Sequence, residues 1–292
     1  MSADLTVSVP GSSANLGPGY DVLALALDVR LKVTVAPLDG GQSTLHVEGE
    51  GADRLRLDDS NRFLAGLRAG ARAAGKDEPP GVRIDMHNDI PLGRGLGSSA
   101  AASVAGLLVA RELLGAPATP EDLLELATEI EGHPENAAAS LYGGFVACAG
   151  VRVVRYEPPA DLRAVVFIPE RELATANMRA ALPATVSHAD AARNAGATAA
   201  IVGAFATGDL SLLGSMYDDR LHEPYRTRVY PELPAMVGAA RAGGALGAAL
   251  SGAGSTILAL CLADAVDEVR GAMELEADRL QLVGVARQVG LA

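Results

Sequence analysis

The stretch from residue 91 to residue 101, PLGRGLGSSAA, places three glycines and two serines directly before a run of alanines. Glycine allows backbone angles and close approaches that other residues do not. Residues 98–114 are typical of a helix with Ser98 near its N-cap. The first N–H groups of a helix have no partner within it, and the helix dipole adds partial positive charge there. The sequence therefore predicts an anion-binding loop, with phosphate as the first candidate.

Four further stretches combine residue types that could bind a polar ligand. Arg179 and Arg226, in TANMR and DDRLHEPYR, could each form a fork onto a carboxylate or phosphate. Each stretch also has a purely structural interpretation: in chain order these are a surface turn, a helix cap, arginines in solvated ion pairs, and a plain hairpin. The four stretches cover residues 10–21 (PGSSANLGPGYD), 131–136 (EGHPEN), the two arginine-bearing segments 175–179 and 218–226, and 250–260 (LSGAGSTILAL).

Several common chemistries are excluded by what the sequence lacks. Neither lysine, Lys32 or Lys76, stands in a GxxxxGK[ST] setting, and the glycines of the first stretch have the wrong spacing for GxGxxG. The motifs HExxH, CxxC and GxSxG are missing, which argues against zinc proteases, thiol redox proteins and hydrolases. A formal net charge of −12 argues against nucleic acid as a partner.

The elements that must position these stretches alternate irregularly between strands and helices, which predicts an α+β protein. The EPPAD segment, residues 157–161, is the expected boundary between a domain of residues 1–158 and one of residues 159–292. Strands are expected over residues 5–9, 31–36, 44–48, 82–87, 144–148, 151–156, 162–168, 247–250, 256–261 and 282–286, and helices over residues 61–74, 98–114, 120–131, 189–207, 231–242 and 263–276.

The location of the protein is predicted from the same sequence. Cys148 and Cys261 lie in apolar segments and indicate small core residues, not a disulfide. The N-terminus lacks a basic region followed by an apolar run, and no stretch is long and charge-free enough to cross a bilayer. We therefore expect a soluble cytoplasmic protein with no membrane partner.

PLGRGLGSSAA closely resembles the phosphate-binding loop of the GHMP kinases, and SGAGS at 251–255 resembles their C-terminal glycine-rich motif. Within that superfamily SANLGPGYD, EGHPEN and DRLHEPYR resemble the homoserine kinases, so the resemblance runs from about residue 5 to residue 262. It implies ATP-dependent phosphorylation of the L-homoserine hydroxyl in threonine biosynthesis. It also implies an N-terminal α/β domain with ribosomal-protein-like topology, a ferredoxin-like C-terminal domain and a homodimer.

The same resemblance assigns the ATP and Mg²⁺ contacts. The backbone amides of the loop would surround the phosphates, and Asn61 would lie beside the adenine. Ser98 or Ser99 would offer a hydroxyl to Mg²⁺, with Glu125 as its carboxylate ligand and Glu129, one turn further along the helix, as the alternative. The expected nucleotide-binding residues are Asn61, Pro91, Leu92, Gly93, Arg94, Gly95, Leu96, Gly97, Ser98, Ser99, Ala100 and Ala101.

The amino-acid substrate is expected to meet charged side chains. By resemblance Arg179 and Arg226 take the carboxylate with help from Thr175. The ammonium and hydroxyl side would be lined by Asn15, Asp21, His133 and Glu135. Homoserine kinases usually read EGHPDN, so the glutamate in the fifth position of this motif keeps the charge and adds a methylene.

Asn136 is expected to take part in catalysis, together with Ser99 and Glu125. Several relatives carry aspartate at this position as a proposed base, and an amide cannot replace it in that role. Alignment and charge neutralisation would then suffice, because the transition state of phosphoryl transfer is loose. Two alternatives remain: another GHMP kinase, such as one of the mevalonate pathway, or a non-catalytic ligand sensor of the same fold.

Overall fold

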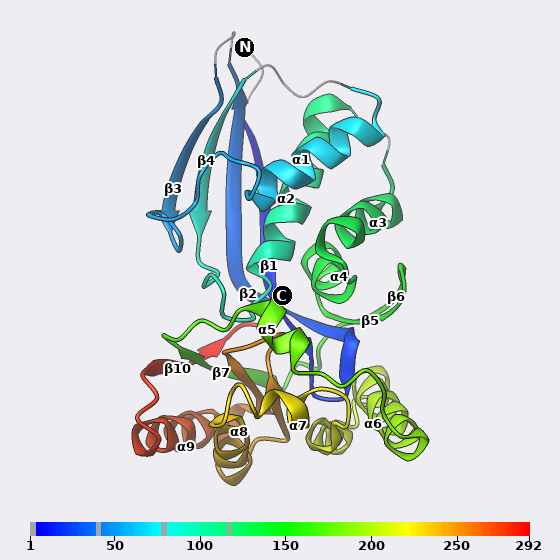
Figure 1. Cartoon of the computed structure of the whole chain (residues 1–292), viewed down its shortest axis with the longest axis vertical. Coiled ribbons are helices and arrows are strands. Elements are labelled where there is room, and N and C mark those ends of the chain that lie inside the picture. The colour runs from blue at the N-terminus through cyan, green and yellow to red at the C-terminus, as the bar shows by residue number, and fades with distance from the viewer. Residues whose placement is uncertain (1–3, 39–41, 77–80, 116–117) are drawn as a thin grey trace.

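Two β-sheets, one beyond the other along the longest axis, form the framework of the protein (Figure 1). This computed structural model describes residues 4–38, 42–76, 81–115 and 118–292. In that part of the chain the first sheet contains strands β1 to β6 and the second contains β7 to β10. The predicted α+β class is confirmed.

The first sheet is mixed and has the strand order β3-β4-β2-β5-β6, with β1 also paired to β2. Only β3 and β4 are parallel; the other pairs are antiparallel. Alternate residues of β4 are buried and exposed, so one face of the sheet is covered there. The strands are β1 (Leu5–Asn15), β2 (Gly19–Pro37), β3 (Thr44–Gly49), β4 (Val82–Asn88), β5 (Phe145–Ala149) and β6 (Arg152–Tyr156).

Helices α1 (Arg62–Ala73), α2 (Ser98–Leu114), α3 (Pro120–Glu131) and α4 (Glu135–Tyr142) cover that face (Figure 1). The helix α2 is apolar almost all round because it is buried between α1 and β1. A Cβ on Gly106 of α2 would stand 2.1 Å from the backbone oxygen of Phe63 in α1. Such close backbone packing holds the middle of α2 against the first turn of α1.

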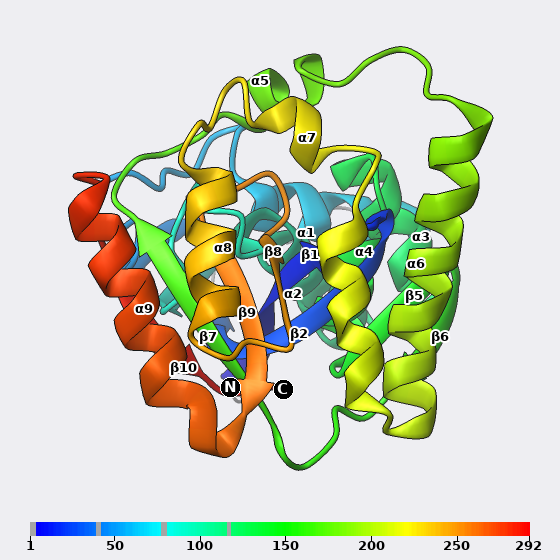
Figure 2. The ribbon, with the colours of Figure 1, turned by 90° about the horizontal axis from the view of Figure 1, so that it is seen from below.

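The second sheet is antiparallel and has the order β10-β7-β9-β8. One helical region lies between its first two strands and another between its last two, which gives the βαββαβ connection of a ferredoxin-like fold. Figure 2 shows α8 and α9 lying under this sheet. The elements are β7 (Leu162–Pro169), α5 (Thr175–Ala180), α6 (His188–Thr207), η1 (Leu210–Asp218), α7 (Glu223–Arg226), α8 (Leu233–Ala242), β8 (Gly247–Leu250), β9 (Ile257–Leu262), η2 (Ala263–Ala265), α9 (Val266–Arg279) and β10 (Gly284–Val289).

Strands β7, β8 and β9 of the second sheet are largely buried on both faces, and one of these faces belongs to the core of the first sheet. Val165 and Phe167 of β7 pack with α8 and α9, whereas Ala164 and Val166 join the core beneath the first sheet. Residues near the C-terminus also return to the first sheet, where Leu291 pairs with Leu27. The predicted boundary after residue 158 falls between β6 and β7, and the division into domains there stays a prediction.

The structure differs most from expectation in residues 10–21, which are a strand, a three-residue turn and a strand. Main-chain pairing extends β1 through its serines, as where Ser12 faces Ala26, and such pairing does not depend on apolar side chains. Helices α4, α5, η1 and α7 were also not predicted. At the start of α2 the N-cap is Gly97, with φ of 72° and no side-chain cap.

The remaining sequence predictions concern the cysteines and the membrane. Cys148 and Cys261 are both buried free thiols, and burial raises the pKa of Cys148 to about 12 and that of Cys261 to about 11. No helix in the described part of the chain is long and apolar enough to cross a membrane.

Candidate active site

All five stretches singled out in the sequence meet at one cavity of about 250 Å³ between the two sheets. It is bordered by the β1–β2 turn, the glycine-rich loop before α2, the α3–α4 connection, α5, α7 and the β8–β9 turn. Its lining residues are Asn15, Asp21, Arg62, Pro91, Gly93, Gly95, Leu96, Gly97, Ser98, Ser99, Ala100, Glu131, His133, Glu135, Asn136, Thr175, Arg179, Arg226, Gly252 and Ala253.

The loop before α2 needs its glycines partly for its own packing. Gly95 and Gly97 have φ of 76° and 72°, in the left-handed region that favours glycine. A Cβ on Gly95 would stand 2.1 Å from the backbone oxygen of Ser251, and one on Gly97 would stand 2.2 Å from the hydroxyl of Ser12. The sequence predicts that these glycines allow close approach of an anion; in the structure they also allow close contact with β1 and the β8–β9 turn.

The start of α2 presents to the cavity N–H donors that have no partner within the helix. The first helical hydrogen bond runs from the Ala101 N–H to the Gly97 oxygen. The N–H groups of Ser98, Ser99 and Ala100 therefore have no partner within the helix, and all three residues line the cavity. Partial positive charge collects at this point.

Arg94 points away from the cavity. Its Nε donates to the oxygen of Pro169 at 2.8 Å, and its Nη1 lies 2.9 Å from the carboxylate of Glu172. Glu172 also pairs with Arg54, and hydrogen bonds from the two guanidinium groups, that of Arg54 first, lower its pKa. The Arg94 side chain thus ties the loop to the end of β7 and the segment after it and does not line the cavity.

A second cavity of about 200 Å³ adjoins the first and shares Arg62, Gly93, Ser98 and Ser99 with it. Much of its lining is apolar. Asn61 lies at its edge and also caps α1, because its Oδ1 accepts the Leu64 N–H at 3.2 Å. Leu92 lines this cavity rather than the first, and Ala101 is buried in the core. The remaining side chains of this cavity are Leu31, Leu55, Ser60, Phe63, Met86, Asn88 and Ala102.

Glu125, expected as a metal ligand beside Ser99, does not line the main cavity. Glu125 and Glu129 border a separate cavity between α1, α2 and α3, because they lie on another face of α3. Glu131, the last residue of α3, lines the main cavity, and its Oε1 accepts a hydrogen bond from the buried Ser103 hydroxyl at 2.7 Å. The sequence signal that pointed to Glu131 was its position as the first residue of EGHPEN.

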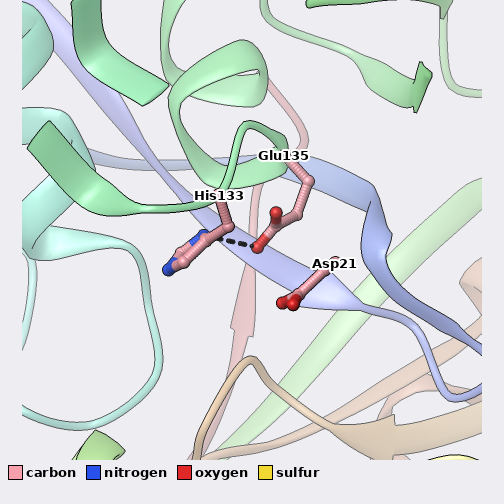
Figure 3. A group of neighbouring side chains, drawn as sticks. All are labelled: Asp21, His133 and Glu135. Atoms are coloured by element: carbon pink, nitrogen blue, oxygen red, sulfur yellow. Dashed lines mark ion pairs between the residues drawn. The ribbon is translucent and has the colours of Figure 1, made fainter. Parts of the chain in front are cut away.

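His133 and Glu135, at the start of α4, face Asp21 of β2 (Figure 3). Ligand atoms of these three residues all lie within 4.8 Å of one another. His133 Nδ1 is 2.9 Å from Glu135 Oε1, and this contact with Glu135 raises the histidine pKa against the opposing effect of burial. Glu135 is 1% exposed, and its Oε2 has no hydrogen-bond partner within the described ranges. The group is suited to a cation.

Asn136 is held on both sides of its amide. Its Oδ1 accepts a hydrogen bond from the Ser12 hydroxyl at 2.8 Å, and its Nδ2 donates to Glu135 Oε1 at 3.0 Å. Asn15 is held in the same way: its Nδ2 donates to the Gly252 oxygen at 2.9 Å and its Oδ1 accepts the Asp21 N–H. Both amides therefore fix neighbouring segments as well as lining the cavity.

The two predicted arginines have opposite surroundings. Arg179 forms two hydrogen bonds to Asp21, at 3.0 and 2.9 Å, and one to the Tyr20 hydroxyl. Arg226 is 2% exposed, and no carboxylate in the described part of the chain forms an ion pair with it. Burial is the main cause that lowers the pKa of its guanidinium. Thr175, the first residue of α5, lies at the exposed edge. Arg226 is thus a buried cation at a cavity wall.

Comparison with known proteins shows the family of the chain. Residues 61–144 match the N-terminal domain of the GHMP kinases, and residues 201–278 match the C-terminal domain of that family. The chain is 40% identical to the homoserine kinase of Moorella thermoacetica over 87% of this chain and 86% of that protein. It is 43% identical to the homoserine kinase of Streptomyces coelicolor over 92% of this chain and 88% of that one.

Solved structures agree with the sequence comparison. A homoserine kinase from Cytophaga hutchinsonii superposes with a TM-score of 0.87 at 30% identity, covering 100% of this chain and 96% of that chain. The mevalonate kinase of Methanococcus jannaschii, at 14% identity and a TM-score of 0.73, shares the fold and covers 99% of each chain. The predicted two-domain GHMP kinase fold is confirmed, and the chain belongs to the homoserine kinase family of the GHMP kinases.

Proposed function

We propose that this protein transfers the γ-phosphoryl group of ATP to the side-chain hydroxyl of L-homoserine, giving ADP and O-phospho-L-homoserine. One observation supports it above the others: the buried Arg226, which has no carboxylate partner among the described residues, shares a cavity with the N–H groups at the start of α2 that have no partner within the helix. An arginine in such a place fits a substrate carboxylate. A phosphate group fits the start of the helix.

The nucleotide would span the two adjoining cavities. Its phosphates would accept hydrogen bonds from the N–H groups of Ser98, Ser99 and Ala100, in place of a P-loop lysine. Its base would enter the smaller cavity, where Leu55 and Leu92 offer apolar surface next to Asn61. Arg62 borders both cavities and would lie along the phosphate chain.

The residues present fit Mg²⁺ with Glu131 in place of Glu125. Glu131 Oε2 has no hydrogen-bond partner in the part of the chain described, whereas Oε1 is held by Ser103. Ser99 would supply a hydroxyl from across the cavity. One carboxylate is enough, because Mg²⁺ in kinases takes its other ligands from water and phosphate. When bound, the ion neutralises charge on the phosphate oxygens.

L-Homoserine would bind as a zwitterion at the other end of the cavity. Its carboxylate would accept hydrogen bonds from Arg226 and Arg179, and its ammonium group would donate to Asp21 and the unpaired oxygen of Glu135. Asp21 and Arg179 pair with each other in this structure, so the site is already matched to one negative and one positive group.

In the transfer, the hydroxyl oxygen of homoserine forms a bond to the γ-phosphorus as the bond to the β–γ bridging oxygen breaks, and the hydroxyl proton passes to an oxygen of the transferred phosphoryl group. Asn136 would contribute by alignment, because its amide cannot take a proton and is already held by Ser12 and Glu135. Such alignment accelerates phosphoryl transfer through a loose transition state.

The test is a steady-state assay of ADP release with L-homoserine, mevalonate and galactose in turn. We expect turnover with L-homoserine and formation of one phosphomonoester, detected by ³¹P NMR. Turnover with mevalonate alone would indicate another kinase of the superfamily, and no turnover with any of the three would indicate a sensor.

A further inference from the structure

The structure assigns to His222 the role of a positioning residue that holds Arg226 in place for the substrate carboxylate. We propose that it does so as a neutral imidazole with its proton on Nε2. This inference rests on the proposed function, because it takes the carboxylate to be the group that Arg226 receives. His222 belongs to DRLHEPYR, precedes α7 and is completely buried.

The neighbours of the two ring nitrogens fix the tautomer. His222 Nε2 lies 2.7 Å from the backbone oxygen of Gly17, which can only accept a hydrogen bond, and 3.6 Å from the carboxylate of Asp219. Nδ1 lies 3.1 Å from Nη1 of Arg226, which can only donate. Nε2 must therefore carry the proton and Nδ1 must accept. A doubly protonated ring would place an N–H group against the guanidinium.

This contact decides which part of Arg226 remains for a ligand. Nη1 donates both to His222 Nδ1 and to the Gly252 oxygen at 2.8 Å, and so uses both of its hydrogens. Nε faces the Met178 oxygen at 3.4 Å. Among the described residues nothing accepts a hydrogen bond from Nη2, and Arg226 lines the cavity. The substrate carboxylate would therefore bind to Nη2. The orientation of Nη2 is fixed because Nη1 and Nε contact His222, Gly252 and Met178.

The charged and titratable groups around His222 are consistent with a neutral ring. Burial is the largest cause and lowers its pKa to about 4, aided by the charge of Arg226 and opposed by Asp219 and Asp21. The ring of Tyr20 also packs on it, with the centroids 5.3 Å apart. Gly17 belongs to the β1–β2 turn, so His222 links that turn directly to the arginine.

The tautomer is tested without substrate by long-range ¹H–¹⁵N NMR of the folded protein, recorded between about pH 5 and pH 8. The His222 signals are identified by their loss in His222→Asn, among the five histidines of the chain. We expect a protonated Nε2 and an unprotonated Nδ1 over this whole range. A proton on Nδ1, or protonation of the ring near pH 6.5, would overturn the proposal.

The link to Arg226 is tested by a double-mutant cycle with His222→Asn and Arg226→Leu. We expect His222→Asn to raise the KM for L-homoserine roughly tenfold with kcat and the KM for ATP little changed, because its effect is confined to one hydrogen bond to a charged group. In the Arg226→Leu background the same change should have no further effect on this KM. His46→Asn, at an exposed site on β3, is the matched control.

Two kinetic results would contradict the proposal. One is an equal effect of His222→Asn with and without Arg226, and the other is an equal rise in both KM values together with a lower melting temperature. Either result would make His222 a general structural residue. Failure of the proposed function is distinguishable, because it would appear as no turnover of L-homoserine by the unaltered protein.

Discussion

The two ends of the main cavity differ in the kind of atoms that line them. At the start of α2 the lining consists mainly of backbone around Gly95, Gly97 and Ser98, with little charge on side chains. At the other end the lining is made of ionisable side chains, with Arg226 and Glu135 almost fully buried. The positions of backbone donors are set by the fold, whereas the stability of a buried charge depends on each neighbouring group.

This difference predicts different responses to substitution. Changes at the backbone end should act through the conformation of the loop and so affect stability together with nucleotide binding. Changes at the side-chain end should act on the amino-acid substrate and leave ATP binding intact. A residue such as Glu131, between the two ends, should affect the chemical step.

The largest effect is expected for Arg226→Leu. Removing one partner of a buried ion pair costs about 2–5 kcal/mol, so kcat/KM for L-homoserine should fall roughly thirtyfold to several thousandfold. The dissociation constant for ATP, measured by calorimetry, should stay within about twofold. Arg193→Leu is the control, because Arg193 is exposed and pairs with Asp218. Equal losses for ATP and L-homoserine would break the distinction between the two ends.

Glu131→Gln should give the next largest effect. We expect kcat to fall by roughly a hundredfold and the Mg²⁺ concentration for half activity to rise, because a ligand carboxylate is lost. Ser103→Ala, which only frees Glu131 Oε1, should cost about tenfold. Glu125→Gln, on the same helix but outside the cavity, should behave like the unaltered protein. A larger loss for Glu125→Gln than for Glu131→Gln would restore the original metal assignment.

Alanine substitutions in the glycine-rich loop test the backbone end of the cavity through the stability of the protein. Gly95→Ala should lower the free energy of unfolding by more than about 2 kcal/mol, because it combines a positive φ with a clash against backbone. Gly93→Ala also has a positive φ, but its Cβ would meet only the flexible carboxylate of Glu172, at 3.2 Å. It should cost about 1 kcal/mol. Denaturant unfolding measures both, and equal costs would show that the contact with Ser251 is unimportant.

The smallest effects concern pH, and the two histidines should differ in sign. The pKa of His133 is raised, so its contribution to stability is present below about pH 6.5 and is lost as pH rises through the folded value. The pKa of His222 is lowered to about 4, so its contribution is present above about pH 6.5 and is lost as pH falls toward about 4.

Unfolding free energies of His133→Asn and His222→Asn, compared with the unaltered protein at about pH 5.5 and pH 8, test these signs. The loss in His133→Asn should be larger at the lower pH, and the loss in His222→Asn should be larger at the higher pH. The same trend for both variants would refute the opposite environments that the structure gives them.

Sequence patterns predicted most of the framework because runs and regular repeats of apolar residues report burial directly. The helices over residues 98–114 and 120–131 and the strand over 247–250 were predicted with the bounds observed. The strand segment at 10–15 could not be, since its serines and glycine pair through the main chain. Short elements such as α4 and α7 depend on tertiary packing, which a local pattern does not contain.

The site could be predicted where a residue lies within a recognisable motif. It was harder to predict where the residue's place depends on how its helix is rotated. Asp21, Glu135 and Arg226 all line the cavity as expected. Glu125 does not, because a helix of known length still leaves its rotation about its axis to be set by packing against α1 and α2. His222 was not predicted because its role depends on contacts with Gly17 and Arg226, which lie in different elements.

The central claim, that the buried cation of Arg226 selects an amino-acid substrate by its carboxylate, is tested most directly by two substrates and two proteins. L-Homoserine and its neutral carboxamide analogue are compared with the unaltered protein and with Arg226→Leu. We expect the unaltered protein to prefer L-homoserine in kcat/KM by roughly thirtyfold or more, and Arg226→Leu to lose most of that preference. Equal losses for both substrates, or no preference by the unaltered protein, would contradict the claim.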